Sequence, residues 1–145
     1  MDTAVIRELL YSKSIEEAKL FLSSCSESNT LHVYAYNYDW NDGFAVPKAI
    51  VSNPACSLGT ALMIFYLADG YHYLTQRDAA SDFPEWQGFL SDLYRRITAG
   101  SFSDSAIAFS VPLSKVQVFK LKKQLSEEEQ VFITSIDGEN YDLSV

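Results

Sequence analysis

Apolar residues recur at intervals of three and four through most of the first hundred positions. Between residues 82 and 100 the repeat consists of Trp86, Phe89, Leu90, Leu93, Tyr94 and Ile97. Between residues 57 and 70 it consists of Leu58, Ala61, Leu62, Phe65 and Ala68. Because this spacing puts all the members of a run on one face of an α-helix, it predicts amphipathic helices with a shared apolar core.

Capping residues predict where several of these helices begin and end. Ser14 followed by Glu17 is a capping box, and Asp82 followed by Glu85 is another. Gly70 is expected to end the helix before it in a left-handed conformation. Residues 31–40 fit both the alternation of a strand and the spacing of a helix, and we favour the helix.

The pattern changes after residue 100. Short segments rich in valine, isoleucine and phenylalanine follow, at residues 106–111, 115–121, 130–136 and 140–145. Such residues favour strands, and Asp137 with Gly138 suits a hairpin turn. Residues 114–125 also fit a helix, because Val118, Leu121 and Leu125 share a helical face, and we favour the strand there with the helix as the alternative.

These patterns predict an α+β fold. The first two thirds would be mostly helical with helical-repeat-like packing, and a small antiparallel β meander would follow at the C-terminus. A length of 145 residues suits a single domain over residues 1–145. The longest apolar run, residues 61–68, is too short for a membrane span, and the N-terminal residues lack the basic character of a signal peptide. We therefore expect a cytoplasmic protein that does not bind membranes and is a monomer when free.

The charge of the chain indicates which partners it attracts. With 19 acidic and 11 basic residues, the net charge is -8, which disfavours nucleic acid and favours a basic partner. The densest acidic region is in the C-terminal third. The candidate partner-binding residues there are Glu127, Glu128, Glu129, Asp137, Glu139 and Asp142. An alternative is that these carboxylates only keep the protein soluble.

A polar and aromatic cluster at residues 37–44, NYDWNDGF, resembles a ligand-binding loop in composition only. Aligned on a calcium-binding loop, it places Asp42 where glycine is required and Lys48 where glutamate is required. We interpret it as a folded corner in which a glycine frees the turn and aromatic side chains anchor it. The structural residues of this corner are Trp40, Asp42, Gly43, Phe44 and Pro47.

Residues suited to catalysis are few and widely separated. His32 and His72 are the only histidines, and neither has metal-ligand spacing to another ligand. Cys25 and Cys56 form no metal or redox motif and are expected to be free thiols. The sequence therefore predicts no metal, no cofactor and no catalytic residue. An enzyme would have to bring His32, His72 and Cys56 together in space.

The central block of the sequence resembles a bacterial domain family without an assigned reaction. The positions that carry the resemblance are Asn37, Trp40, Asp42, Gly43, Phe44, Pro47, Asn53, Pro54, Cys56, Gly59, Thr60, Ala61 and Leu62. Small acidic proteins of this kind are similar to immunity proteins encoded beside bacterial toxins. The resemblance implies a protein that neutralises a cognate toxin by binding it, and a nuclease of a contact-dependent growth inhibition system is one candidate. The alternatives are a small enzyme and a helical adaptor.

Overall fold

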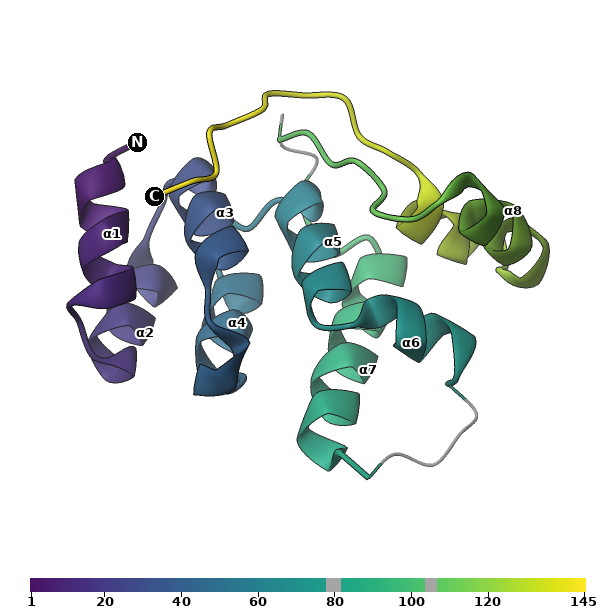
Figure 1. Ribbon diagram of the computed structural model, residues 1–145, viewed down its shortest axis with the longest axis horizontal. Helices are drawn as coiled ribbons and strands as arrows, with labels where there is room; N and C mark the ends of the chain where they lie inside the picture. Colours follow the sequence, from purple (N-terminus) through teal and green to yellow (C-terminus); the bar gives the residue numbers. More distant parts are fainter. Residues whose placement is uncertain (78–81, 104–106) are drawn as a thin grey trace.

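The computed structural model describes residues 1–77, 82–103 and 107–145, and every element found there is helical. Figure 1 shows their arrangement. In chain order they are α1 (Thr3–Tyr11), α2 (Ile15–Ser24), α3 (Ser28–Asn37), the 3-10 helix η1 (Trp40–Asp42), α4 (Ala45–Ser52), α5 (Leu58–Leu67), α6 (Gly70–Thr75), α7 (Pro84–Thr98), α8 (Lys115–Gln124) and the 3-10 helix η2 (Glu128–Ile133).

The helices form two rows. α3 lies between α1 and α5 in the first row, α2 packs on α4 in the second, and α7 packs on α5 (Figure 1). Apolar side chains at helical spacing meet between the rows and form one core, which includes Leu22, Leu31 and Phe65. Within the described ranges, no helix combines the length and the apolar character that crossing a membrane requires.

Local signals account for most helix ends. The capping box predicted at Ser14 and Glu17 is present. The one predicted at Asp82 and Glu85 is wrong, because α7 begins after Phe83 with Pro84 in its first turn and no side-chain cap. A proline tolerates that position since the first N–H groups of a helix have no internal acceptor.

The left-handed residue between α5 and α6 is Asp69, with φ +67°, and not Gly70 as predicted. Gly70 is instead the first residue of α6. A Cβ atom there would lie 2.2 Å from the Phe65 ring, so close packing explains the glycine.

The predicted α+β fold with a C-terminal β meander is wrong. Residues 115–121 belong to α8, which begins with a capping box between Ser114 and Gln117. Leu121 is buried while its neighbours in the chain are exposed, as expected of a helix with one face on the protein. Residues 130–136 lie largely in η2, with Phe132 and Ile133 buried. Both segments are rich in β-branched residues, but the capping box and one-sided burial of α8, and the burial of Phe132 and Ile133 in η2, outweigh that preference.

The rest of the C-terminal third is extended without forming a sheet in the described residues. Isolated bridges join Phe109 to Ile136 and Ile107 to Glu139, and no ladder continues from either. The predicted hairpin with its turn at residues 137–138 is therefore absent from the described residues. Position 106, the first residue of the first predicted strand, lies outside the described residues. Residues 134–145, here called the C-terminal segment, pass across α5 and α3 toward α1 (Figure 1).

Candidate functional site

An open groove of about 440 Å³ lies between α3, α5, α6, residues 108–113 and the C-terminal segment. Its lining residues are His32, Tyr36, Met63, Tyr66, Leu67, Tyr71, Ala108, Phe109, Ser110, Pro112, Leu113, Glu139, Asn140, Tyr141 and Leu143. We call it the apolar groove, because among these residues Glu139 is the one with a formal charge. Apolar lining with a few polar groups is typical of ligand and anchor-residue sites.

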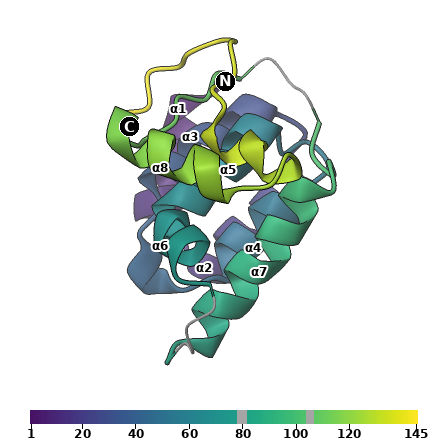
Figure 2. The same cartoon turned by 90° about the vertical axis from the view of Figure 1, so that its right-hand side faces the viewer.

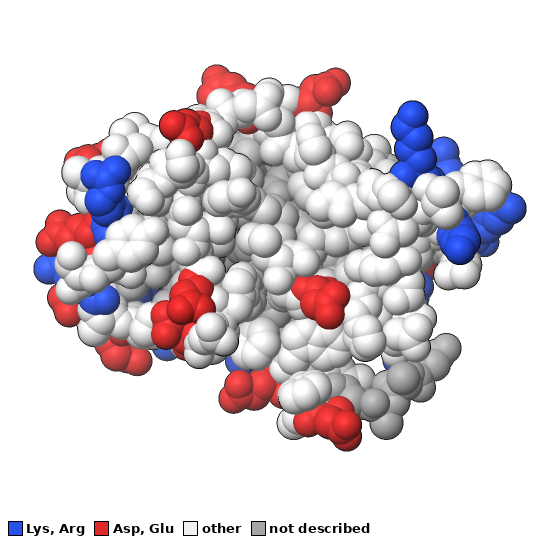
Figure 3. Space-filling view, in the orientation of Figure 1, with Lys and Arg blue, Asp and Glu red and all other residues white. Residues whose placement is uncertain are grey.

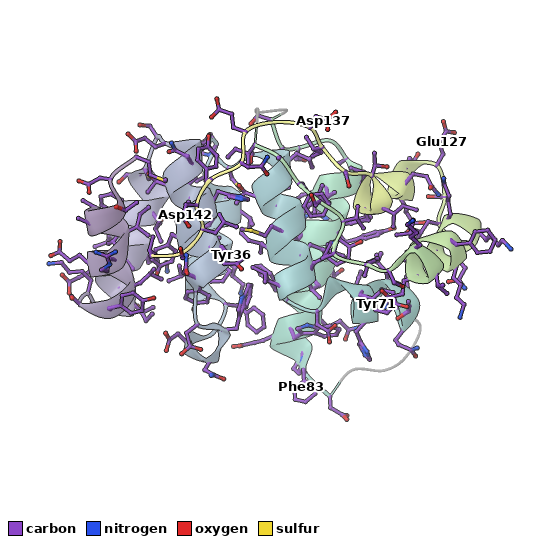
Figure 4. The ribbon with its side chains drawn as sticks, turned by 45° about the horizontal axis from the view of Figure 1, so that its top comes forward. Tyr36, Tyr71, Phe83, Glu127, Asp137 and Asp142 are labelled. Carbon is purple, nitrogen blue, oxygen red and sulfur yellow. The ribbon has the colours of Figure 1, made fainter. Side chains whose placement is uncertain are left out.

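Two large side chains of the groove are left open to solvent. Tyr36 on α3 is 48% exposed and Leu67 at the end of α5 is 42% exposed. In Figure 4, Tyr36 and Tyr71 lie on opposite sides of this region, and Asp142 lies beside Tyr36. The face in Figure 3 is hollowed near its middle, and most of its Lys and Arg side chains gather at the two ends, over α1 and α8. The groove thus offers exposed apolar contact area with little basic charge nearby.

Buried polar groups fix the floor of the groove. His32 Nδ1 lies 2.9 Å from Thr60 Oγ1, which lies 3.0 Å from Ser57 Oγ. Burial lowers the pKa of His32 to about 4, so the ring is neutral at physiological pH. A neutral histidine held by a hydroxyl network supports the packing between α3 and α5 and adds no charge to the groove.

The C-terminal segment forms the opposite wall and is tied down at several points. Asn37 Nδ2 donates to the Leu143 carbonyl at 2.6 Å. The Ala108 N–H donates to the Glu139 carbonyl at 3.0 Å, and the Tyr141 hydroxyl donates to the Glu139 carboxylate at 2.8 Å. These bonds set the position of the Glu139 side chain at the groove.

The corner at residues 37–44 is a structural element. Trp40 and Asp42 belong to η1, and Gly43 follows with φ +92° and ψ −166°, a region that essentially only glycine occupies. The Trp40 ring packs edge-on against Tyr38, Phe44 and Phe89. Pro47 is buried in the first turn of α4, where its missing N–H removes no intrahelical hydrogen bond.

The three residues that an enzyme would need lie in different environments. His32 lines the apolar groove, whereas His72 packs against Trp86 in a separate cavity of about 760 Å³. Cys56 is buried, and burial raises the pKa of its thiol to about 12, which opposes formation of a nucleophilic thiolate. Within the described residues, no group of three or more His, Cys, Asp or Glu side chains is arranged to hold a metal ion.

The six acidic candidates are spread along the end of the chain and have different surroundings. Glu127, Asp137 and Asp142 are exposed and well separated in Figure 4, and Glu128 is exposed on η2. Glu129 is buried, and its carboxylate is hydrogen-bonded to Tyr94 and paired with Arg77. Glu139 alone lines the groove. The partner-binding role of this set stays a prediction. Of the six residues, Glu139 is the best placed for that role, because it lines the groove.

Sequence analysis missed Tyr36 and Leu67 as candidate site residues. A signal was present, because each is a large apolar residue that lies outside the inward-facing stripe of its own helix. In α3 the stripe includes Leu31, Tyr34 and Ala35, and in α5 it includes positions 61, 62 and 65. A large apolar side chain outside the stripe is expected to be exposed or to line a groove.

The fold and the groove together define an all-helical protein, over its described residues, with an open apolar site on one face. The chain belongs to the family described as a domain of unknown function (DUF4274), whose model matches residues 26–98. Neither the curated proteins nor the solved structures contain a match to this chain.

The family match divides the groove into two parts. It covers α3 to α7 and so includes the wall that carries Tyr36, Leu67 and Tyr71. The wall that carries Glu139 and Tyr141 lies outside the matched residues, as do α1, α2 and α8. The family part thus supplies one apolar wall, residues 108–113 add further apolar lining, and the C-terminal segment adds the charged group.

Proposed function

We propose that this protein is a non-catalytic binding protein, and specifically an immunity protein that neutralises a cognate bacterial toxin by occupying the surface the toxin needs. The apolar groove is the observation that carries this proposal. Inhibition by binding requires no active site on the inhibitor, only a surface that holds the partner tightly.

The groove has the properties of an anchor site for a partner protein. Its volume of about 440 Å³ accommodates one or two large side chains. Tyr36 and Leu67 are already exposed at its edge, so a partner gains apolar burial without opening the core. In protein complexes, a few such desolvated anchors supply most of the binding free energy.

Charge supports a basic partner. The chain carries a net charge of -8, and Glu139 is the single charged side chain among the described residues that line the groove. A lysine or arginine beside the partner's apolar anchor would pair with this carboxylate. The overall field would also speed the encounter with a basic toxin.

The separation of His32, His72 and Cys56 favours binding over catalysis. His32 is neutral, held through Nδ1, and His72 lies in another cavity. The thiol of Cys56 is buried and protonated at neutral pH. An enzyme that used these three groups would need a rearrangement of the helices that carry them.

The experiment is to produce the chain together with the protein encoded by the adjacent gene. We expect that protein to stop growth when produced alone and the chain to restore growth, with a one-to-one complex measurable by calorimetry. Leu67→Glu should weaken the complex at least tenfold by placing a charge in the groove. Leu20→Glu is the matched control, because Leu20 is an exposed helical leucine far from the groove, 74% exposed on α2.

Three outcomes decide between the functions. Protection that is lost with Leu67→Glu and kept with Leu20→Glu supports the proposal. A complex with a neighbour that is not toxic would favour the helical adaptor instead. No complex with a toxic neighbour would overturn the immunity proposal.

A further inference from the structure

The face of α8 that points away from the protein is both apolar and basic. Val116 and Phe119 are 61% and 60% exposed, and they lie on the side opposite the buried Leu121. The Lys123 ammonium lies 4.2 Å from the centre of the Phe119 ring. Exposed apolar residues next to one another on a helix are a common sign of an interaction surface.

Lysines surround this apolar pair. α8 contains Lys115, Lys120, Lys122 and Lys123 and no acidic residue, in a chain whose net charge is -8. All four are exposed, and within the described residues none forms a salt bridge. At helical spacing, Lys120 falls on one side of the Val116 and Phe119 pair, and Lys115 and Lys122 fall on the other.

The position of α8 leaves this face accessible. α8 lies at one end of the long axis, and viewed from that end no other element covers it (Figure 2). The lysine cluster at that end is the largest basic area visible in Figure 3. The nearest acidic residues in the chain come after α8: Glu127 directly precedes η2, and Glu128 is its first residue. A flat anionic surface can therefore reach the outward face of α8.

We propose that α8 attaches the protein reversibly to an anionic lipid surface. Lysines on both sides of an apolar strip allow the ammonium groups to contact lipid phosphates while Val116 and Phe119 enter the region between headgroups and acyl chains. This attachment differs from a membrane span and needs only one exposed helical face. It replaces the expectation from the sequence that the protein does not bind membranes, which rested on the absence of a spanning segment rather than on the local charge of α8. It is independent of the groove and of the proposed function.

Two features favour lipid over other anionic partners. The α8 face carries only two exposed large apolar side chains, which is few for a stable protein interface but sufficient for a fluid surface that adapts to it. The cluster consists of lysines without arginine, and the Phe119 ring is already occupied by Lys123, so neither bidentate phosphate recognition nor stacking on a base is available.

Co-sedimentation with vesicles tests the proposal. Vesicles of phosphatidylcholine alone are compared with vesicles that also contain phosphatidylserine, at low and at physiological salt. We expect binding only to the anionic vesicles, and a binding constant that falls at least tenfold from low to physiological salt. Lys120→Glu with Lys123→Glu should abolish binding, and Phe119→Ser should weaken it several-fold.

The matched control is Lys19→Glu with Lys48→Glu, which changes the net charge equally at exposed lysines on α2 and α4. It should retain at least half of the wild-type binding, and circular dichroism should show unchanged helix content in all variants. Absence of wild-type binding to anionic vesicles would overturn the proposal. So would an equal loss in the control, or binding to polyglutamate or to RNA without binding to vesicles.

Discussion

The carboxylate of Glu129 accepts a hydrogen bond of 2.6 Å from the hydroxyl of Tyr94, and this contact joins η2 to α7. Arg77 donates to the same carboxylate, and the Ser126 N–H donates to its other oxygen at 2.9 Å. Phe132 stacks on the Tyr94 ring with centroids 5.5 Å apart. This network fastens the start of the C-terminal region to the helical body.

The Glu129 network should make stability depend on acid pH. Burial raises the pKa of this carboxyl, but hydrogen bonds from Tyr94, Ser126 and Arg77 outweigh burial and lower the pKa from 4.5 to about 2. Because the folded pKa lies below the unfolded one, the stabilisation is present above pH 4.5 and is lost as the pH falls toward 2. Urea denaturation across this range should show the decline.

Glu129→Gln should lower the free energy of unfolding at neutral pH by about 1–3 kcal/mol, since it weakens the hydrogen bonds to a charged acceptor. The free energy of unfolding of the variant should also decline less steeply between about pH 5 and pH 2 than that of the wild type, because the variant has no carboxyl group at this position to titrate. Glu128→Gln is the control, because Glu128 is exposed on the same 3-10 helix. Equal effects of the two changes would contradict this role for Glu129.

Gly43 and Gly88 should respond in opposite directions to alanine. Both have open space where a Cβ would lie, but Gly43 has φ +92° and Gly88 lies within α7. Gly43→Ala should therefore lower the free energy of unfolding by about 1–3 kcal/mol through backbone strain alone. Gly88→Ala should raise it by about 0.5–1 kcal/mol. An unchanged denaturation midpoint for Gly43→Ala would mean that the corner is not strained.

The junction between α5 and α6 gives a second contrasting pair. Gly70→Ala should lower stability by about 1–3 kcal/mol, because the new methyl group would overlap the ring of Phe65, which is fully buried. Asp69→Gly should raise stability by about 0.5–1 kcal/mol, since glycine adopts φ +67° without strain. Thermal melts of both variants measure whether the melting temperature falls for Gly70→Ala and rises for Asp69→Gly. A higher melting temperature for Gly70→Ala would disprove the packing argument.

If the proposed toxin binds, the association rate should fall steeply with added salt while the dissociation rate changes much less. Screening weakens long-range attraction to the charge of -8 more than it weakens packed contacts. Asp137→Lys with Glu139→Lys should slow association about tenfold, because Glu139 lines the groove. Stopped-flow or surface plasmon resonance measures both rates.

Glu127→Lys with Glu128→Lys is the matched charge reversal away from the groove, and Glu129 is left unchanged because it is buried. The same slowing in both variants would mean that only total charge matters. No slowing in either would remove the C-terminal acids from the interface.

Residues near in sequence determined the helices of the first hundred positions. The capping box at Ser14 and the turn at Gly43 depend on contacts within a few residues, so the sequence predicts them directly. At Ser114 the same kind of local signal was present as a capping box, but the prediction favoured a strand over the helix that forms there. The strand preference of the valines near it reflects side-chain shape, which an exposed helix face also accommodates.

Contacts between distant residues decided the rest. Phe132 lies between Phe65 and Tyr94, and the Tyr66 hydroxyl donates to its carbonyl at 2.6 Å, so η2 takes its shape from α5 and α7. The apolar groove likewise exists only because the C-terminal segment crosses α3 and α5. The sequence by itself determined most of the helices before residue 100 and the acidic charge, through short-range periodicity and composition. The tertiary structure decided that Glu129 is buried and Glu139 faces a groove, because burial depends on which distant surface a side chain meets.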